Sequence, residues 1–283
     1  MVELKLQDLP EGCKAHIISL TSPRDACRLC SISRDFKSAA ESDAVWNKFL
    51  PPDTHTILSQ SSEPGLVARS KKELYLTLCD NPVLIGNRKM SFALDKWSGK
   101  KCYMISASDL GITWGSTPQY WTWTADPESR FEEVAELLDV CWLEISGKLN
   151  TRLLSPSTLY KAYLVFKFAA RTYGFVHLPS KVTVSLEGGE ATTQTVFLHN
   201  EEEINYSEGE SDEEGEVNNT EGVSNNDQYQ KERSDGWLEI ELGDFFCEGG
   251  EDGQLNMIFL NTTGRWKSGL IVQGIEVRPK RKY

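Results

Sequence analysis

The sequence predicts an α+β protein of several domains, in which an all-α N-terminal unit precedes a mainly antiparallel β-sandwich. In residues 1–50, turn and helix-cap residues interrupt apolar residues at helical spacing. From Ser91 onward, runs rich in Val, Ile, Leu, Tyr and Phe alternate with polar residues, and Gly or Pro stand between the runs. The 39% hydrophobic content of the 283 residues is enough for a packed core.

The first 50 residues predict a compact unit of short helices. Ile17, Ile18 and Leu20 supply apolar mass, and Ser22-Pro23 places a capping hydroxyl before a proline suited to the first helical position. A later short helix carries Trp46. A unit this small buries little apolar surface by itself, so an exposed apolar face would favour a partner.

Residues 51–90 predict a connector that contains one helix, at Lys71–Cys79. The sandwich is expected over residues 91–279. It is interrupted by an insert, residues 201–233, whose Glu, Asn, Ser and Gly content predicts disorder. Residues 201–221 contain ten acidic and no basic residues, so the rest of the chain carries only −2 of the formal charge of −12.

The composition also limits the expected classes of binding partner and the expected cellular compartment. No run approaches the roughly 18 apolar residues of a membrane helix, and the N-terminus lacks a signal-peptide pattern. Seven scattered cysteines indicate reduced thiols. We therefore expect a protein of the cytoplasm and/or nucleus, with no membrane insertion and no nucleic-acid partner.

Catalytic and metal-binding motifs are sparse. Only four His are present, without a Gly-x-Ser-x-Gly motif or a phosphate-binding loop, so we expect neither enzyme activity nor a cofactor. A glycosidase carboxylate pair is the alternative that residue counts leave open. The pairs Cys13/His16 and Cys27/Cys30 mimic zinc ligands, but their i,i+3 spacing on predicted helices favours ordinary packing, so no metal site is expected.

An aromatic cluster opens the predicted β-domain. Three tryptophans and one tyrosine lie within residues 114–123. Aromatic faces can stack on a pyranose ring while neighbouring polar groups bind its hydroxyls, although some of these rings could be core. Trp121 and Trp123 share one strand face, so only a bend would allow one to be buried and the other to stack on a ligand. Three further tryptophans lie within apolar runs and are expected in the core: Trp142, Trp237 and Trp266.

The N-terminal run from Leu9-Pro10 to Phe36, with Val45-Trp46-Asn-Lys-Phe-Leu-Pro after it, resembles an F-box. The resemblance implies a helical trio that docks on the Skp-type adaptor of SCF ubiquitin ligases. It assigns six residues to the docking surface or its supporting core: Leu9, Pro10, Ile17, Ile18, Leu29 and Trp46. The alternative is a helical cap on the β-domain.

The remaining chain resembles the phloem-protein-two or Nictaba-like lectin domain. The resemblance rests on Ile-Thr-Trp (112–114), Pro-Gln-Tyr-Trp-Thr-Trp (118–123), Glu-Val-Ala-Glu-Leu (133–137), Tyr-Leu-Val-Phe-Lys (163–167), Ser-Asp-Gly-Trp-Leu-Glu-Ile (234–240), Gly-Glu-Asp-Gly (250–253) and the run Trp-Lys-Ser-Gly to Val-Arg-Pro (266–279). It implies a jelly-roll-like β-sandwich that binds N-acetylglucosamine (GlcNAc) oligomers. The family's sugar-contacting tryptophans correspond to Trp114 and Trp121, beside Gln119 and Tyr120.

Two departures from the family are visible. Acidic side chains proposed as sugar partners align near Gln254 and Asn261, which are neutral. A lysine run found in free-standing members is replaced by the acidic insert.

Together the two resemblances imply a substrate-recognition subunit of an SCF-type E3 ubiquitin ligase that binds a GlcNAc-containing glycan or glycoprotein target. Two alternatives remain open. The chain could be a lectin without a ligase role, or a ligase receptor that recognises a peptide surface instead of sugar.

Overall fold

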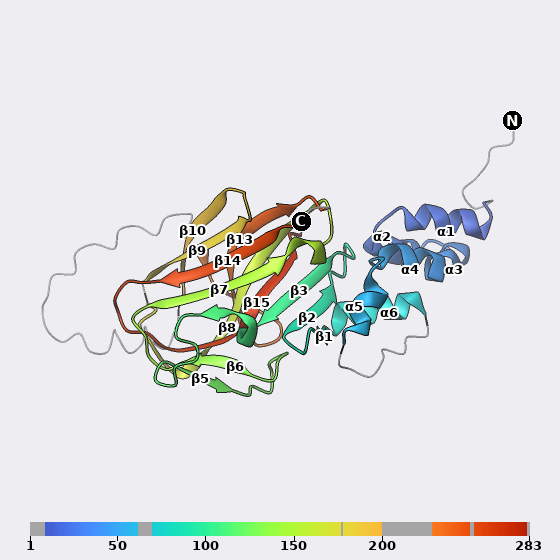
Figure 1. Cartoon of the computed structure of the whole chain (residues 1–283). Coiled ribbons are helices and arrows are strands. Elements are labelled where there is room, and N and C mark those ends of the chain that lie inside the picture. The colour runs from blue at the N-terminus through green and yellow to red at the C-terminus, as the bar shows by residue number, and fades with distance from the viewer. Residues whose placement is uncertain (1–8, 62–69, 177, 200–227, 250–251, 282–283) are drawn as a thin grey trace, which may run out of the picture. The chain divides into compact units, whose positions relative to one another are not determined.

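The computed structural model describes residues 9–61, 70–176, 178–199, 228–249 and 252–281 (Figure 1). The chain divides into two compact units, Met1–Tyr103 and Met104–Tyr283. None of the helices in these described ranges reaches the length and apolarity of a membrane span.

The N-terminal unit begins with helices whose starts are set by local capping. Ser22, Ser33, Ser42 and Ser70 each accept a hydrogen bond from a backbone N–H in the first turn of the helix that follows. The helices are α1 (Glu11–Ser19), α2 (Pro23–Leu29), α3 (Arg34–Glu41), α4 (Asp43–Phe49), α5 (Thr54–Ser59) and α6 (Lys71–Asp80).

A strand pair completes this unit. β1 (Val83–Ile85) and β2 (Met90–Leu94) pair antiparallel, and β3 (Lys101–Ser106) begins in the same unit. The fully buried Tyr75 on α6 donates its hydroxyl to the carbonyls of Asp95 (3.1 Å) and Lys96 (3.2 Å), just after β2. Residues 51–90 therefore hold two helices and a strand, where the sequence indicated a connector with one helix.

The C-terminal unit is built from strands. They are β4 (Gly111–Ile112), β5 (Trp121–Thr124), β6 (Val134–Leu137), β7 (Leu143–Asn150), β8 (Thr158–Tyr173), β9 (Pro179–Leu186), β10 (Ala191–Phe197), β11 (Gln228–Tyr229), β12 (Lys231–Glu232), β13 (Leu238–Cys247), β14 (Gln254–Asn261) and β15 (Ser268–Pro279). Short 3₁₀ turns lie at Ala107–Asp109 and Thr151–Leu153.

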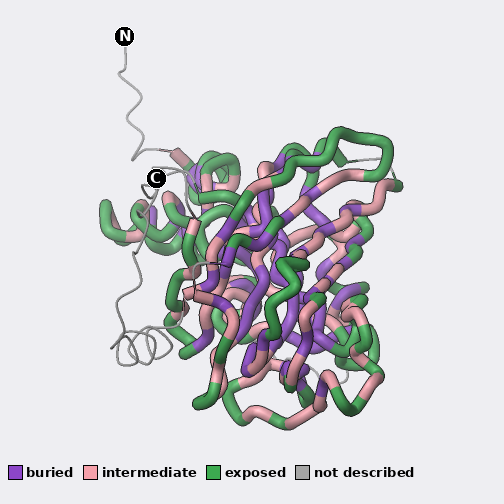
Figure 2. Tube along the Cα trace, turned by 90° about the vertical axis from the view of Figure 1, so that its left-hand side faces the viewer, coloured by how far each residue is buried: buried purple, intermediate pink, exposed green. Residues whose placement is uncertain are grey.

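Two sheets enclose the core of this unit. One contains β15, β8, β13 and β12 in that order, with β6 pairing β15 and β5 pairing β6; the other runs β11-β10-β9-β14-β7-β4. Buried and less buried positions alternate along β7 and β14, as a half-buried strand requires. In Figure 2 short buried and less buried stretches alternate along the tube. A Cβ on Gly147 of β7 would lie only 3.0 Å from Cδ1 of Ile275 on β15, so the sheets pack closely there.

These features confirm the predicted fold class: residues 9–50 form helices only, and a mainly antiparallel β-sandwich follows. The end of the predicted insert requires a correction. Residues 228–233 contain β11 and β12, and β11 pairs in parallel with β10. The rest of the insert, residues 201–227, lies outside the described residues.

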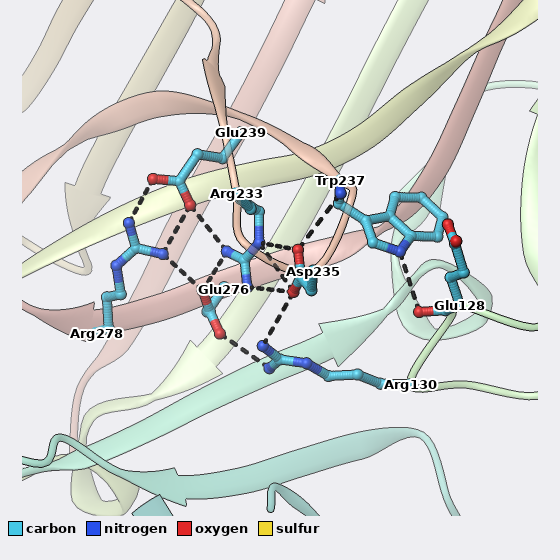
Figure 3. Close-up of polar contacts among 8 residues, drawn as sticks. All are labelled: Glu128, Arg130, Arg233, Asp235, Trp237, Glu239, Glu276 and Arg278. Carbon is cyan, nitrogen blue, oxygen red and sulfur yellow. Dashed lines mark hydrogen bonds and ion pairs between the residues drawn. The ribbon is translucent and has the colours of Figure 1, made fainter. Parts of the chain in front are cut away.

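A buried ion-pair network crosses the first sheet (Figure 3). Glu276 on β15 binds Arg130 (2.9 Å), Arg233 (2.7 Å) and Arg278 (2.7 Å), and its side chain is only 8% exposed. Glu239 on β13 pairs with the same Arg233 and Arg278, and Asp235 pairs with Arg233. Three guanidinium groups therefore face three carboxylates, which is the condition for burying charge in a protein interior.

The network joins segments far apart in the sequence. Arg130 comes from the loop before β6, and Arg233 and Asp235 come from the turn between β12 and β13. Trp237 fixes the same region, because its indole N–H donates to the Glu128 carbonyl at 3.1 Å and its side chain is fully buried. Of the tryptophans expected in the core from the sequence, Trp237 lies there.

We predict that Glu276→Gln lowers the free energy of unfolding by about 3–5 kcal/mol at neutral pH, because it leaves buried guanidinium groups without their counter-ion. Burial alone would raise the pKa of Glu276, but the charges of Arg130, Arg233 and Arg278 outweigh it and hold that pKa well below its usual range. The stability that Glu276 contributes is therefore present above the unfolded-state pKa of about 4.3 and is lost as the pH falls towards the folded-state pKa.

Urea unfolding at pH 7, 5 and 3 measures this effect. Between pH 5 and pH 3 the unmodified chain should lose more stability than Glu276→Gln does. Glu133→Gln, a change at an exposed carboxylate, should retain the pH dependence of the unmodified chain. Equal pH dependence in the unmodified chain and Glu276→Gln would contradict the assignment.

Candidate functional site

The loop between β4 and β5 presents an exposed indole. Three backbone turns shape it: Gly115 N–H donates to Ile112 (2.9 Å), Thr117 N–H to Trp114 (2.8 Å) and Tyr120 N–H to Thr117 (2.9 Å). Trp114 is 44% exposed and has a φ of 58°, in the left-handed region that a large L-residue rarely adopts. Such backbone conformations are concentrated at binding and catalytic sites, where the surrounding structure maintains them.

Two indoles on β5, which follows this loop, hold the loop by hydrogen bonds. Trp121 Nε1 donates to the Thr113 carbonyl (3.2 Å), and Trp123 Nε1 donates to the Gly115 carbonyl (3.0 Å). Thr113 and Gly115 are the two residues on either side of Trp114. These two bonds therefore fix the backbone on both sides of the exposed ring.

Trp121 is 2% exposed, so its ring offers no face to a ligand. The sequence-based assignment of Trp121 to sugar stacking is corrected: this side chain belongs to the core and supports the loop. Tyr120 lies against Trp114, with ring centroids 5.2 Å apart, and is half-buried. Gln119 is exposed in the same loop.

An open hollow of about 380 Å³ lies beside Trp114. Its wall combines indole and aliphatic side chains, serine hydroxyls and glycine backbone and contains no ionisable side chain. Such a surface suits a neutral, hydroxyl-rich ligand better than a charged one, because aromatic faces supply contact area and hydroxyls supply hydrogen bonds. The lining residues are Ser108, Leu110, Gly111, Ile112, Trp114, Gly115, Ser116 and Trp123.

Other polar and aromatic residues of this unit lie differently from the sequence interpretation. Asn261 is buried and donates its side-chain amide to Ser180 Oγ at 3.0 Å, which is a structural role. Trp142 and Trp266, expected in the core, are 47% and 52% exposed. That expectation was wrong for both. Each tryptophan lies just before the first residue of a strand, and not on the inward face of that strand.

The predicted adaptor-binding residues divide between surface and core. Ile17 is 39% exposed and Pro10 is exposed, whereas Leu9 and Leu29 are half-buried. Ile18 and Trp46 are fully buried. Trp46 donates its indole N–H to the Ala40 carbonyl at 2.7 Å and packs against the Tyr75 ring at 5.1 Å, so it supports the helices from within.

Two exposed apolar side chains of the N-terminal helices were not assigned to the adaptor-binding surface from the sequence, although Leu20 was counted among the apolar residues there. Leu20, after α1, is 74% exposed, and Ile32, after α2, is 63% exposed. Helical periodicity gives no signal for residues just past a helix end, which explains why they were missed.

Metal-ligating side chains do not converge in the parts of the chain that the structure describes. In these parts, no three His, Cys, Asp or Glu side chains are grouped so that they could hold a metal ion. Cys13 and Cys27, each from one of the zinc-like pairs, are exposed free thiols.

Comparison with protein families gives two matches. The phloem protein 2 family matches residues 100–279, and the F-box domain matches residues 6–48. Among curated Arabidopsis thaliana proteins, the F-box protein PP2-B10 is 44% identical over 96% of this chain and 93% of its own length. The F-box protein PP2-B1 from the same plant is 43% identical over 96% of this chain and 89% of its own.

Among solved structures, a family 35 carbohydrate-binding module from Clostridium thermocellum matches 63% of this chain and 98% of its own, with 11% identity and a TM-score of 0.30. The predicted resemblance to F-box and phloem-protein-two proteins is confirmed by the family matches.

The contrast between the two loop tryptophans can be measured directly. We predict that Trp121→Ala lowers the free energy of unfolding by about 3–5 kcal/mol, because it leaves a cavity in the core and frees the Thr113 carbonyl. Trp114→Ala should change it by no more than about 1 kcal/mol, since half of the ring faces water. Chemical denaturation followed by circular dichroism measures both. Similar losses for both variants would contradict the assigned roles.

Proposed function

The chain belongs to the phloem protein 2 family and carries an F-box, and we propose that it is the substrate-recognition subunit of an SCF-type ubiquitin ligase. The helical unit binds the Skp-type adaptor, and the sandwich binds the target through a GlcNAc-containing glycan. The chain performs no chemistry in this role: it brings a target to the ligase. We expect the complex to act in the cytoplasm or the nucleus.

The exposed Trp114 ring is the observation that carries the sugar-binding half of the proposal. Its backbone is fixed on both sides by the indoles of buried Trp121 and half-buried Trp123, and the hollow beside it has hydroxyls but no ionisable side chain. A stacking ring whose backbone is already fixed loses less freedom when a ligand binds, which favours affinity. The amide and hydroxyl groups of GlcNAc are suited to hydrogen bonding with Ser108, Ser116 and the loop backbone.

The apolar surface of the helical unit supports the adaptor-binding half. Ile17, Leu20 and Ile32 expose 39%, 74% and 63% of their surfaces on a unit of short helices. Large exposed aliphatic groups on a small unit indicate a protein-binding surface, because burial against a partner removes them from water.

We predict that Trp114→Ala weakens binding of triacetylchitotriose by at least about tenfold, the equivalent of 1.4 kcal/mol. Isothermal titration calorimetry of the full chain measures this. Trp97→Ala is the matched control, because Trp97 is 46% exposed but belongs to the N-terminal unit. Unchanged affinity in Trp114→Ala would remove the site assignment. Target capture that survives deglycosylation would favour a peptide surface as the recognised feature.

We predict that Ile17→Asp abolishes co-purification of the full chain with the Skp-type adaptor, because it places a charge in an apolar interface. Thr56→Asp on the exposed side of α5 is the matched control and should leave co-purification intact. Both variants should keep the unfolding midpoint of the unmodified chain. Adaptor binding that persists in a folded Ile17→Asp chain would favour a lectin without a ligase role.

A further inference from the structure

A second exposed indole lies at the start of β7. Trp142 is 47% exposed, and its Nε1 donates to Glu144 Oε2 at 3.1 Å. Leu143 and Ile145, the residues that alternate with them, are buried. Trp142 and Glu144 therefore belong to the outer side of the sheet, as a paired ring and carboxylate.

This pair adjoins the Trp114 loop. Gly111 pairs with Ser146 and Ile112 with Ile145 in the β4–β7 register, so the next residue, Thr113, lies opposite Glu144. Thr113 N–H donates to the Glu144 carbonyl at 3.0 Å, and the Thr113 hydroxyl lies 3.5 Å from Glu144 Oε2. The Glu144 carboxylate thus has Trp142 on one side and the residue preceding Trp114 on the other.

A buried lysine fixes the segment that leads to Trp142. Lys267 is fully buried, and its ammonium donates to the carbonyls of Cys141 (3.0 Å) and Arg265 (2.5 Å). Val140 and Lys267 also form a two-hydrogen-bond bridge, at 3.0 and 2.8 Å. The backbone before Trp142 is therefore held in place before any ligand arrives.

The chemistry of the pair matches what a sugar ring requires. The indole provides a flat apolar face, and the Glu144 carboxylate, which accepts the Trp142 N–H and the Thr113 hydroxyl, keeps further lone pairs for hydroxyl donors. We propose that Trp142 and Glu144 form a second sugar subsite, occupied by a further unit of the same glycan that binds at Trp114. This inference rests on the proposed function and extends it, because it names the residues that contact a second unit of the bound oligosaccharide.

Titration of the full chain with chitooligosaccharides of two to five GlcNAc units tests the subsite. For the unmodified chain, affinity should rise with length, and the rise for the longer oligomers should be about three- to tenfold for one additional aromatic contact. Trp142→Ala should bind the dimer as the unmodified chain does and lose that rise. Glu144→Ala should reduce the rise, because the indole then loses the acceptor that orients it, and Glu144→Gln should retain more of it.

Trp97→Ala, which removes an equally exposed indole of the N-terminal unit, should keep the full length dependence. The unfolding midpoint of each variant verifies that it is folded. A rise that persists in Trp142→Ala, or an unmodified chain that binds all lengths equally, would overturn the second subsite while leaving the Trp114 site standing. Failure of the unmodified chain to bind any length would overturn the proposed sugar recognition together with this inference.

Discussion

The hydrogen bonds from two indole N–H groups to the carbonyls of Thr113 and Gly115 are the constraint on which the candidate site depends. Trp121 is buried in the core, so its bond ties the loop to the core of the sandwich. Between the two fixed carbonyls, Trp114 has little freedom to leave the left-handed backbone region. The packing of Trp121 in the core thus shapes the loop, and the shape of the loop keeps the Trp114 ring exposed.

The N-terminal helices and the sandwich could be predicted because their signals are local. Ser22 caps the helix that Pro23 begins, wherever that helix packs. The alternation of side chains between the two faces of a strand likewise follows from backbone geometry. Which face of a strand becomes buried does not depend on local sequence alone. Trp121 and Trp123 share a face by periodicity, but pairing of β5 with β6, and of β6 with β15, decides how deeply each ring is covered.

Other misses have separate physical reasons. Alternation with Leu143 and Ile145 could have placed Trp142 outside, but its apolar character suggested the core. β1 is three residues long, and β11 and β12 are two residues each, so no periodic pattern could mark them. The charged network around Glu276 unites Arg130 with residues more than 100 positions later, which no pattern within a sequence window can indicate.

The backbone of Trp114 also bears on how this site can be lost. Glycine or asparagine would adopt a φ of 58° with less strain than tryptophan, so folding alone favours replacing the ring. In a duplicated gene copy that no longer needs its ligand, we expect this position to drift towards these small residues while Trp121 persists for the sake of the core. A sister copy that keeps tryptophan there would retain the exposed ring that the proposed sugar recognition needs.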